Sequence, residues 1–172
     1  MRTLFNISVC LVLLFSSAAV HAQVKLKFGH INSQELLAAM PERDSAQLIL
    51  ERYVKQLEGQ LESMQVEYQN KVQDYLKNQN NYTDLIKQTK EQELTDLQER
   101  IQAFQTTAQQ DMGQKESQLL QPIIEKADKA IKEVGKENGY TYIFDLSRGS
   151  VVYFSEVSED VLPLVKKKLG IQ

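Results

Sequence analysis

The sequence predicts an α+β protein in which a long antiparallel helical hairpin, a coiled-coil arm, projects from a small β-rich body. Three observations lead to this prediction. Apolar residues recur at heptad-like spacing on both sides of a turn-prone segment in the middle of the chain. Stretches near both ends have the alternating or aromatic-rich pattern of short strands. Tryptophan is absent, and 7 glycines and 3 prolines in 172 residues leave few helix breakers.

The first 22 residues have the features of a secretory signal peptide. Arg2 precedes an apolar run over residues 7–15, and small residues lead to an expected cleavage after Ala22. The run is too short to span a bilayer as a helix. Cleavage also removes Cys10, the one cysteine, so the mature chain would have no thiol for a disulfide, a metal site or a nucleophile. The sequence therefore predicts an exported protein.

The charge of the expected mature chain is mildly acidic. Without Arg2 it has 19 basic and 23 acidic side chains, and no basic block occurs before Lys166, Lys167 and Lys168. Nucleic acid is therefore disfavoured as a partner.

The mature chain opens with a predicted strand and a short helix. Apolar and lysine side chains alternate over residues 24–32, which is the period of a strand. Asn32 or Ser33 is suited to cap the helix that follows. Pro41 is expected to end this helix or to bend its continuation.

A long arm is predicted over residues 44–134, with its tip near 78–84. Its first half carries an apolar stripe with gaps of three and four residues, and a return stripe follows the asparagine-rich tip. Each half would be roughly 50 Å long or more at about 1.5 Å per residue. The main stripe residues, which are expected to form the seam between the two helices, are Leu57, Leu61, Met64, Tyr68, Leu97, Ile101 and Phe104.

Strand patterns return after the arm. Asn138 and Gly139 form a suitable left-handed helix end. Residues 140–145 and 151–154 then read as two strands joined by a turn, which predicts a β-hairpin.

A final helix is predicted over residues 158–169. Ser158 would cap its start, and the lysine run over residues 166–168 would lie at its negative end.

The β-rich body, residues 23–43 and 135–172, would be too small to stand alone. Three short strands leave two open edges and carry apolar residues on both faces. Association of several chains would close the sheet into a shared barrel-like core, so an oligomer is expected. The candidates for this oligomer core are Val24, Leu26, Phe28, Ile31, Tyr142, Phe144, Val151 and Tyr153.

Apolar residues that lie off the arm seam or near its tip are candidates for contact with a bound client. They are Tyr53, Val66, Tyr75, Tyr82, Ile86 and Met112.

The sequence offers no catalytic, cofactor-binding or metal-binding residues. His30, the only histidine after the expected cleavage site, has no second histidine to form a metal site and is assigned a packing or hydrogen-bonding role. The carboxylates are spread along helix faces, and neither a phosphate-binding loop nor a nucleophile elbow is present. An enzyme is therefore disfavoured.

Both ends of the mature chain resemble the Skp/OmpH family of periplasmic chaperones. The resemblance lies in Leu26-Lys27-Phe28-Gly29-His30-Ile31-Asn32, in Gly139-Tyr140-Thr141-Tyr142-Ile143-Phe144-Asp145, and in Val157-Ser158-Glu159-Asp160-Val161-Leu162. It implies a homotrimer with a small β-barrel body and three hairpin arms. Such a trimer would enclose unfolded outer-membrane proteins without ATP and prevent their aggregation.

One feature departs from the best-known members of that family, which are strongly basic. Residues 41–120 hold nine basic and fourteen acidic side chains, which argues against contact with lipopolysaccharide or an anionic membrane. A structural or adaptor coiled coil of the cell envelope is the alternative function. It would share the arms but have a fixed, folded partner.

Overall fold

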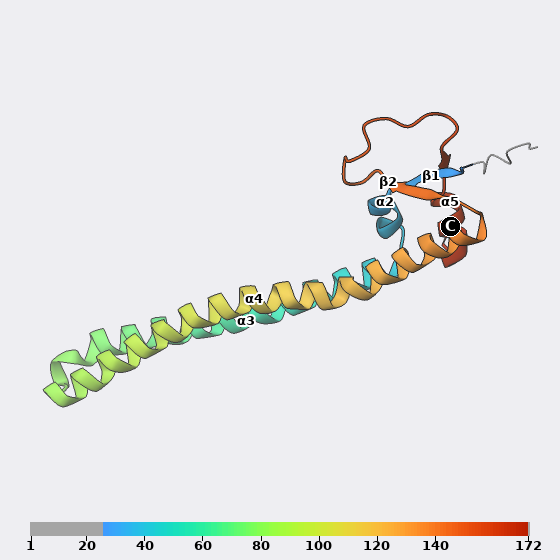
Figure 1. The fold of residues 1–172 in the computed structure, drawn as a ribbon. Coiled ribbons are helices and arrows are strands. Elements are labelled where there is room, and N and C mark those ends of the chain that lie inside the picture. Colours follow the sequence, from blue (N-terminus) through green and yellow to red (C-terminus); the bar gives the residue numbers. More distant parts are fainter. Residues whose placement is uncertain (1–25, 172) are drawn as a thin grey trace, which may run out of the picture.

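The computed structural model describes residues 26–171, which form a long two-helix arm and a small body at one end of it (Figure 1). The arm consists of α3 (Pro41–Asn78) and α4 (Asp84–Glu137), which run antiparallel. The expected signal peptide and Val24 lie outside the described residues.

The chain enters the arm through a short helix, α2 (Ser33–Ala38). Asn32 caps α2, because its side-chain oxygen accepts hydrogen bonds from the backbone N–H groups of Gln34 and Glu35 at 3.1 and 3.2 Å. Pro41 then begins α3, in the first helical turn, where a missing N–H costs nothing. The proline thus separates the two helices.

The arm turns back within the asparagine-rich segment. A single 3₁₀ turn, η2 (Gln79–Asn81), follows α3, and Thr83 caps the start of α4 by accepting a hydrogen bond from the backbone N–H of Ile86 at 3.4 Å. The tip therefore lies inside the predicted range of 78–84.

Helix α4 is much longer than α3 and reaches into the body. At about 1.5 Å per residue, its 54 residues span about 80 Å, against about 57 Å for the 38 residues of α3. It ends at Glu137, and Gly139 follows with a left-handed φ of 68°, as predicted for this pair. The body packs against the last turns of α4 (Figure 1).

The body contains a three-stranded parallel sheet in the order β2-β1-β3. Its strands are β1 (Phe28–Ile31), β2 (Tyr142–Asp145) and β3 (Glu159–Asp160). Phe28 pairs with Tyr142 on one side of β1, and His30 pairs with Asp160 on the other. The N-terminal strand is therefore held between two strands from the C-terminal end of the chain.

The predicted hairpin between residues 140–145 and 151–154 is wrong for the single chain. Residues 151–154 form no strand, and the chain passes over the sheet in a long loop before pairing with the opposite edge of β1 as β3. In the loop these residues bury little, since Val152 is 98% exposed. The pairing of β3 instead carries Val161 into the core, where it is fully buried.

The last helix also begins later than predicted. Helix α5 (Leu162–Leu169) starts four residues beyond Ser158, and the residues before it form β3. Asp160 rather than Ser158 bonds to its first turn, by accepting a hydrogen bond from the backbone N–H of Leu162 at 2.9 Å. The lysine run does occupy the last turn, and Lys168 pairs there with Glu133 of α4 at 3.2 Å.

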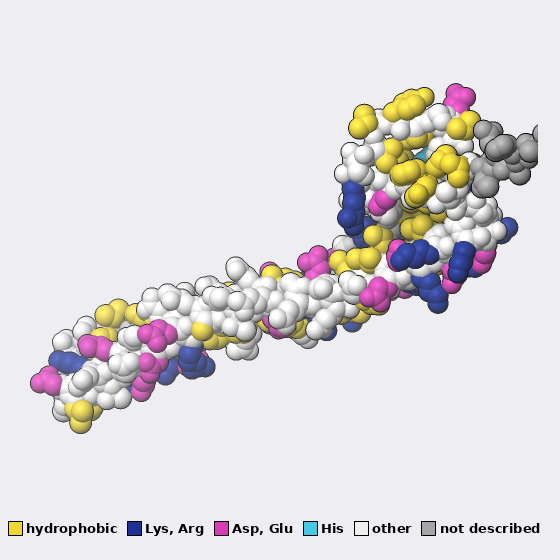
Figure 2. Space-filling view, viewed as in Figure 1, with side chains coloured by type: hydrophobic (Ala, Val, Ile, Leu, Met, Phe, Trp, Pro, Cys, Tyr) yellow, Lys and Arg dark blue, Asp and Glu magenta, His cyan; other side chains and the backbone are white. Residues whose placement is uncertain are grey.

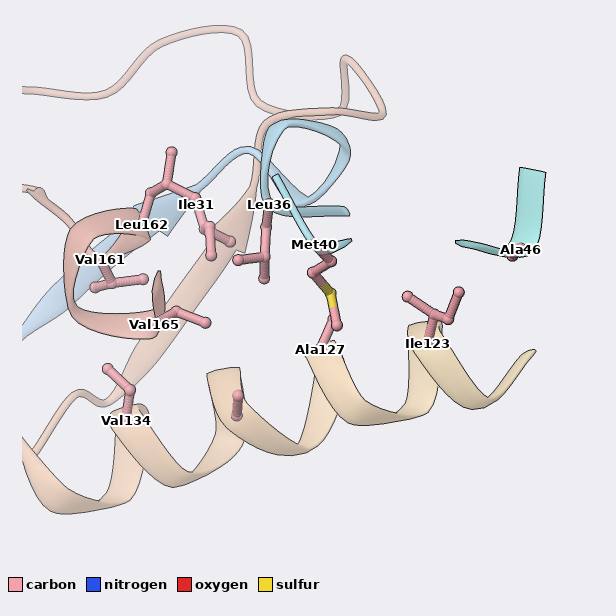
Figure 3. Packing of buried hydrophobic residues seen from close by; sticks show 11 residues of the cluster. Ile31, Leu36, Met40, Ala46, Ile123, Ala127, Val134, Val161, Leu162 and Val165 are labelled. Atoms are coloured by element: carbon pink, nitrogen blue, oxygen red, sulfur yellow. The ribbon is translucent and has the colours of Figure 1, made fainter. Parts of the chain in front are cut away.

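The hydrophobic core lies between α2, α5, the sheet and the end of α4 (Figure 3). The small side chains of Ala127 and Ala130 on α4 face this core. The sheet also requires a glycine, since a Cβ on Gly29 would lie 2.8 Å from Cγ1 of Val161. The largest fully buried side chains are Ile31, Leu36, Met40, Val161 and Val165.

Candidate interaction surfaces

The described part of the chain has open surfaces rather than an enclosed polar site. Within residues 26–171 no polar or charged side chain is buried, and no group of three metal-ligating side chains is found. None of the helices in that range has a stretch long and apolar enough to cross a membrane. The apolar surfaces of the arm and body are therefore the candidate functional sites.

The predicted arm seam is present but thin. Met64 and Leu97 are buried between the two helices, whereas Leu57, Leu61, Tyr68, Ile101 and Phe104 are only half-buried. Two helices alone can enclose few side chains completely, so much of the stripe stays partly accessible.

Polar residues that interrupt the stripe pair across the arm. The hydroxyl of Tyr53 donates a hydrogen bond to Asp111, and this bond is the main reason that the pKa of Tyr53 is raised. Tyr75 donates in the same way to Glu91, which likewise raises the pKa of the Tyr75 phenol. Lys71 lies 3.6 Å from Glu93.

The six client-contact candidates divide into two groups. Val66 and Ile86 are 48% and 43% exposed. The other four, Tyr53, Tyr75, Tyr82 and Met112, are half-buried. Tyr53 and Tyr75 use their hydroxyl groups to hold the arm together, which leaves their half-buried rings for contact with a client.

Two grooves between α3 and α4 collect several of these side chains. The groove near the tip has a volume of about 530 Å³ and is lined by Val66, Tyr75 and Leu94, among others. The second groove, of about 510 Å³, includes Phe104 and Met112. The second groove is mostly apolar, whereas in the groove near the tip the three apolar or aromatic side chains lie among seven polar or charged ones.

Sequence reasoning missed part of the apolar surface at the tip. Leu76 and Leu85, which are not among the client-contact candidates, are 58% and 74% exposed. Both lie within a few residues of the turn. A leucine directly beside a turn-prone segment was the signal that could have identified them, because the seam ends there.

The body presents a second apolar surface on the outer side of the sheet. Phe28, Tyr142 and Phe144 form this aromatic face, with ring centroids 6.0 to 6.4 Å apart. Tyr142 is 59% and Phe144 is 44% exposed. Because the two β2 rings project from alternate residues, they share one face of the strand.

Above the aromatic face passes the crossing loop, residues 146–158, whose apolar side chains are visible on the body in Figure 2. Val152, Tyr153 and Val157 are each at least 81% exposed. No backbone hydrogen bond joins residues 150–154 to any other described residue. A cavity of about 640 Å³ lies between the crossing loop and the sheet.

The remaining oligomer-core candidates take different positions. Leu26 is 55% exposed and Val151 is half-buried in the wall of this cavity. Ile31 is packed inside the chain's own core, so its side chain is not available to another chain.

Ionic contacts hold β3, an edge strand of the sheet, on the side of the sheet away from the aromatic face. Lys27 lies 3.0 Å from Glu159, and its ammonium group is 4.1 Å from the centroid of the Tyr140 ring. The hydrogen bond from Tyr140 and then the one from Lys27 lower the pKa of Glu159. These contacts fasten β3 to the start of β1.

The fold and these surfaces define a class of protein, namely one with a coiled-coil arm on a small β-containing body and open apolar surfaces on both. Over residues 27–169 the sequence matches the family described as outer membrane protein (OmpH-like). The chain belongs to the OmpH-like family, as its two ends predicted, and this membership supports a chaperone role.

A solved structure shares the fold. It is that of a protein from Caulobacter crescentus CB15 assigned as an OmpH-like outer membrane chaperone. The match has a TM-score of 0.73 and covers 88% of each chain at 12% sequence identity. No curated protein sequence matches this chain.

Proposed function

We propose that this protein is an ATP-independent periplasmic holdase, which binds unfolded outer-membrane proteins and prevents their aggregation. Membership of the OmpH-like family supports the chaperone role. The single observation that favours a holdase over an enzyme is the arm, whose apolar side chains line open grooves instead of an enclosed pocket.

The grip on the client would come from the exposed and half-buried apolar side chains of the arm. Val66, Ile86 and Met112 offer short apolar surfaces at different depths along it. An unfolded chain has no fixed shape, so several weak apolar contacts spread along an arm suit it better than one shaped pocket.

We further propose that the protein works as a homotrimer joined through its bodies. The crossing loop supports this, since a β-branched and aromatic segment with an unpaired backbone is typical of a strand without its partner. A second copy would supply that partner and cover Tyr142, Phe144 and Tyr153. Three arms would then surround one client.

The test is the aggregation of a urea-unfolded outer-membrane β-barrel protein on dilution, with and without this protein and with no nucleotide. Suppression near one oligomer per client is expected. No suppression by a folded oligomer would refute the holdase proposal and favour the adaptor alternative.

Comparing two variants tests whether the grooves themselves bind the client. Replacing one residue of each groove, by V66S and M112Q, should raise the concentration needed for half-suppression by about tenfold or more, because each lost apolar contact contributes about 1 kcal/mol and about 1.4 kcal/mol corresponds to tenfold. The matched control is L48S with I124S, two residues that are 56% and 46% exposed but line neither groove. Equal loss in both variants would contradict the assignment of the grooves.

A further inference from the structure

We infer that His30 makes assembly of the body sensitive to acid, an inference that rests on the proposed joining of chains through the aromatic face and crossing loop. His30 is the only histidine among the described residues. Imidazole is the side chain whose charge ordinarily changes between pH 5 and 8. A single group at this position would therefore link assembly to pH.

The geometry places His30 beneath the crossing loop. Its Nδ1 lies 2.9 Å from the hydroxyl oxygen of Ser158, and its ring centroid is 4.2 Å from that of Phe154. His30 is two residues from Phe28 on β1 and is the register partner of Phe144, so it shares the aromatic face with both. It also lines the cavity of about 640 Å³ under the loop.

Few ionisable groups surround this imidazole. Of the residues that line the cavity, only His30 and Tyr153 have ionisable side chains. From β3, Asp160 is the register partner of His30, and its Oδ1 already accepts the hydrogen bond from the backbone N–H of Leu162. From β2 the neighbours are Phe144 and Tyr142. The charged residues of the crossing loop, Arg148 and Glu156, are exposed and do not line the cavity.

The direction of the pH effect on assembly follows from desolvation of the His30 imidazole. In the separate chain the cavity is open, and a protonated imidazole keeps contact with water. When the aromatic rings of a second copy cover the cavity, the neutral imidazole retains its bond to Ser158, whereas the charged form loses solvation. Asp160 acts in the opposite direction, but it is exposed and already accepts one hydrogen bond. Protonation of His30 therefore favours separate chains.

Sedimentation equilibrium of the mature protein at pH 7.5 and pH 5.0 tests the inference, with H30Q as the variant. Glutamine keeps a hydrogen-bonding group for Ser158 but does not titrate in this range. The wild-type association constant should fall by about fivefold or more for each subunit joined at pH 5.0, because protons then bind preferentially to the separate chains. The H30Q protein should change by less than about threefold.

The outcomes separate the two proposals. Equal pH dependence in wild type and H30Q, or none in wild type, overturns the role of His30 and leaves the assembly standing. A wild-type monomer at both pH values overturns the assembly and this inference with it.

H30Q cannot be used if it fails to assemble even at pH 7.5. In that case, nuclear magnetic resonance of the mature wild-type protein follows the signal of its single imidazole with pH, and this titration is compared with the dissociation of the oligomer. Dissociation that follows the imidazole titration supports the inference. Assembly that persists after the imidazole has titrated overturns it.

Discussion

Tyr53 donates a hydrogen bond to Asp111 across the arm, joining two residues that are 58 positions apart in the sequence. Asp111 interrupts the apolar pattern of the return helix, and the structure places it where the phenol of Tyr53 reaches it. A charged residue that breaks the stripe thus contributes to the alignment of the two helices instead of weakening it.

The first prediction concerns this bond. The Y53F variant should raise the hydrogen-exchange rate of backbone amides in both helices around residues 53 and 111, because the cross-arm bond no longer restrains them. Exchange in the body should stay unchanged. The control is Y68F, since no hydrogen bond of the Tyr68 hydroxyl to another described residue is found. Equal effects from both variants would contradict the role of the Tyr53 bond.

The second prediction concerns the glycine in β1. The G29A variant should lower the free energy of unfolding by about 1–3 kcal/mol, because its Cβ would lie 2.8 Å from Val161 and 3.1 Å from the Tyr140 ring. The matched control is G59A in α3, where the added carbon meets nothing within 4 Å beyond its chain neighbours and the nearby backbone of its own helix. There alanine should stabilise the helix by about 0.5–1 kcal/mol. Urea unfolding followed by circular dichroism measures both, and similar shifts in the two variants would refute the packing account.

The third prediction concerns the core. Leu36 is fully buried, so L36A should cost about 2–5 kcal/mol in unfolding free energy. Leu48, on the surface of α3, is 56% exposed, and L48A should change the unfolding free energy by less than about 0.5 kcal/mol. Thermal unfolding of the two variants provides the comparison. A small effect of L36A would mean that α2 adds little to the body core.

The fourth prediction concerns acid stability. Burial alone would raise the pKa of Asp145, but hydrogen bonds from Ser33 and Ser147 outweigh it and lower that pKa below the ordinary value. A carboxylate with a lowered pKa stabilises the fold above its unfolded pKa of about 3.9, and this contribution is lost as the pH falls through the folded value.

The D145N variant should therefore lose stability relative to wild type at pH 6, and the difference should shrink below about pH 4. Urea midpoints at pH 6, 4 and 3 measure the difference. A gap between the two proteins that is constant over this range would show that the charge of Asp145 does not matter.

The fifth prediction concerns the grip on the client. Because the proposed contacts are apolar and residues 41–120 are acidic overall, client binding should change less than about threefold between low and physiological salt. A fluorescence titration with a labelled unfolded β-barrel protein measures this. A steep loss of binding with salt would instead assign the grip to charged side chains.

Much of the arm could be predicted from the sequence because its contacts are local and periodic. Heptad spacing identifies the seam, and the asparagine-rich segment marks the turn, since both depend on residues close together in the chain. The cap of α2, predicted as Asn32 or Ser33 and found at Asn32, and the Gly139 helix end were also predictable, because a cap depends on one residue and its immediate neighbours.

The sheet could not be predicted in the same way. Residues 140–145 and 151–154 have the pattern of a hairpin, yet only the first forms a strand in the single chain. The local pattern reports strand propensity and does not say which edge is available. The choice of Glu159 and Asp160 as the third strand depends on burying Val161 and Val165, which is a long-range effect.

By itself, the sequence determined the long hairpin, its turn and its helix ends, because these follow from periodic and short-range patterns. The family followed from the resemblance of both chain ends to known members. Only the tertiary structure decided that β1 lies between two C-terminal strands, that the end of α4 belongs to the body core, and that Tyr53 and Asp111 meet across the arm. Each of these depends on contacts between residues far apart in the chain. Such contacts are selected by the total apolar area buried and not by any local pattern.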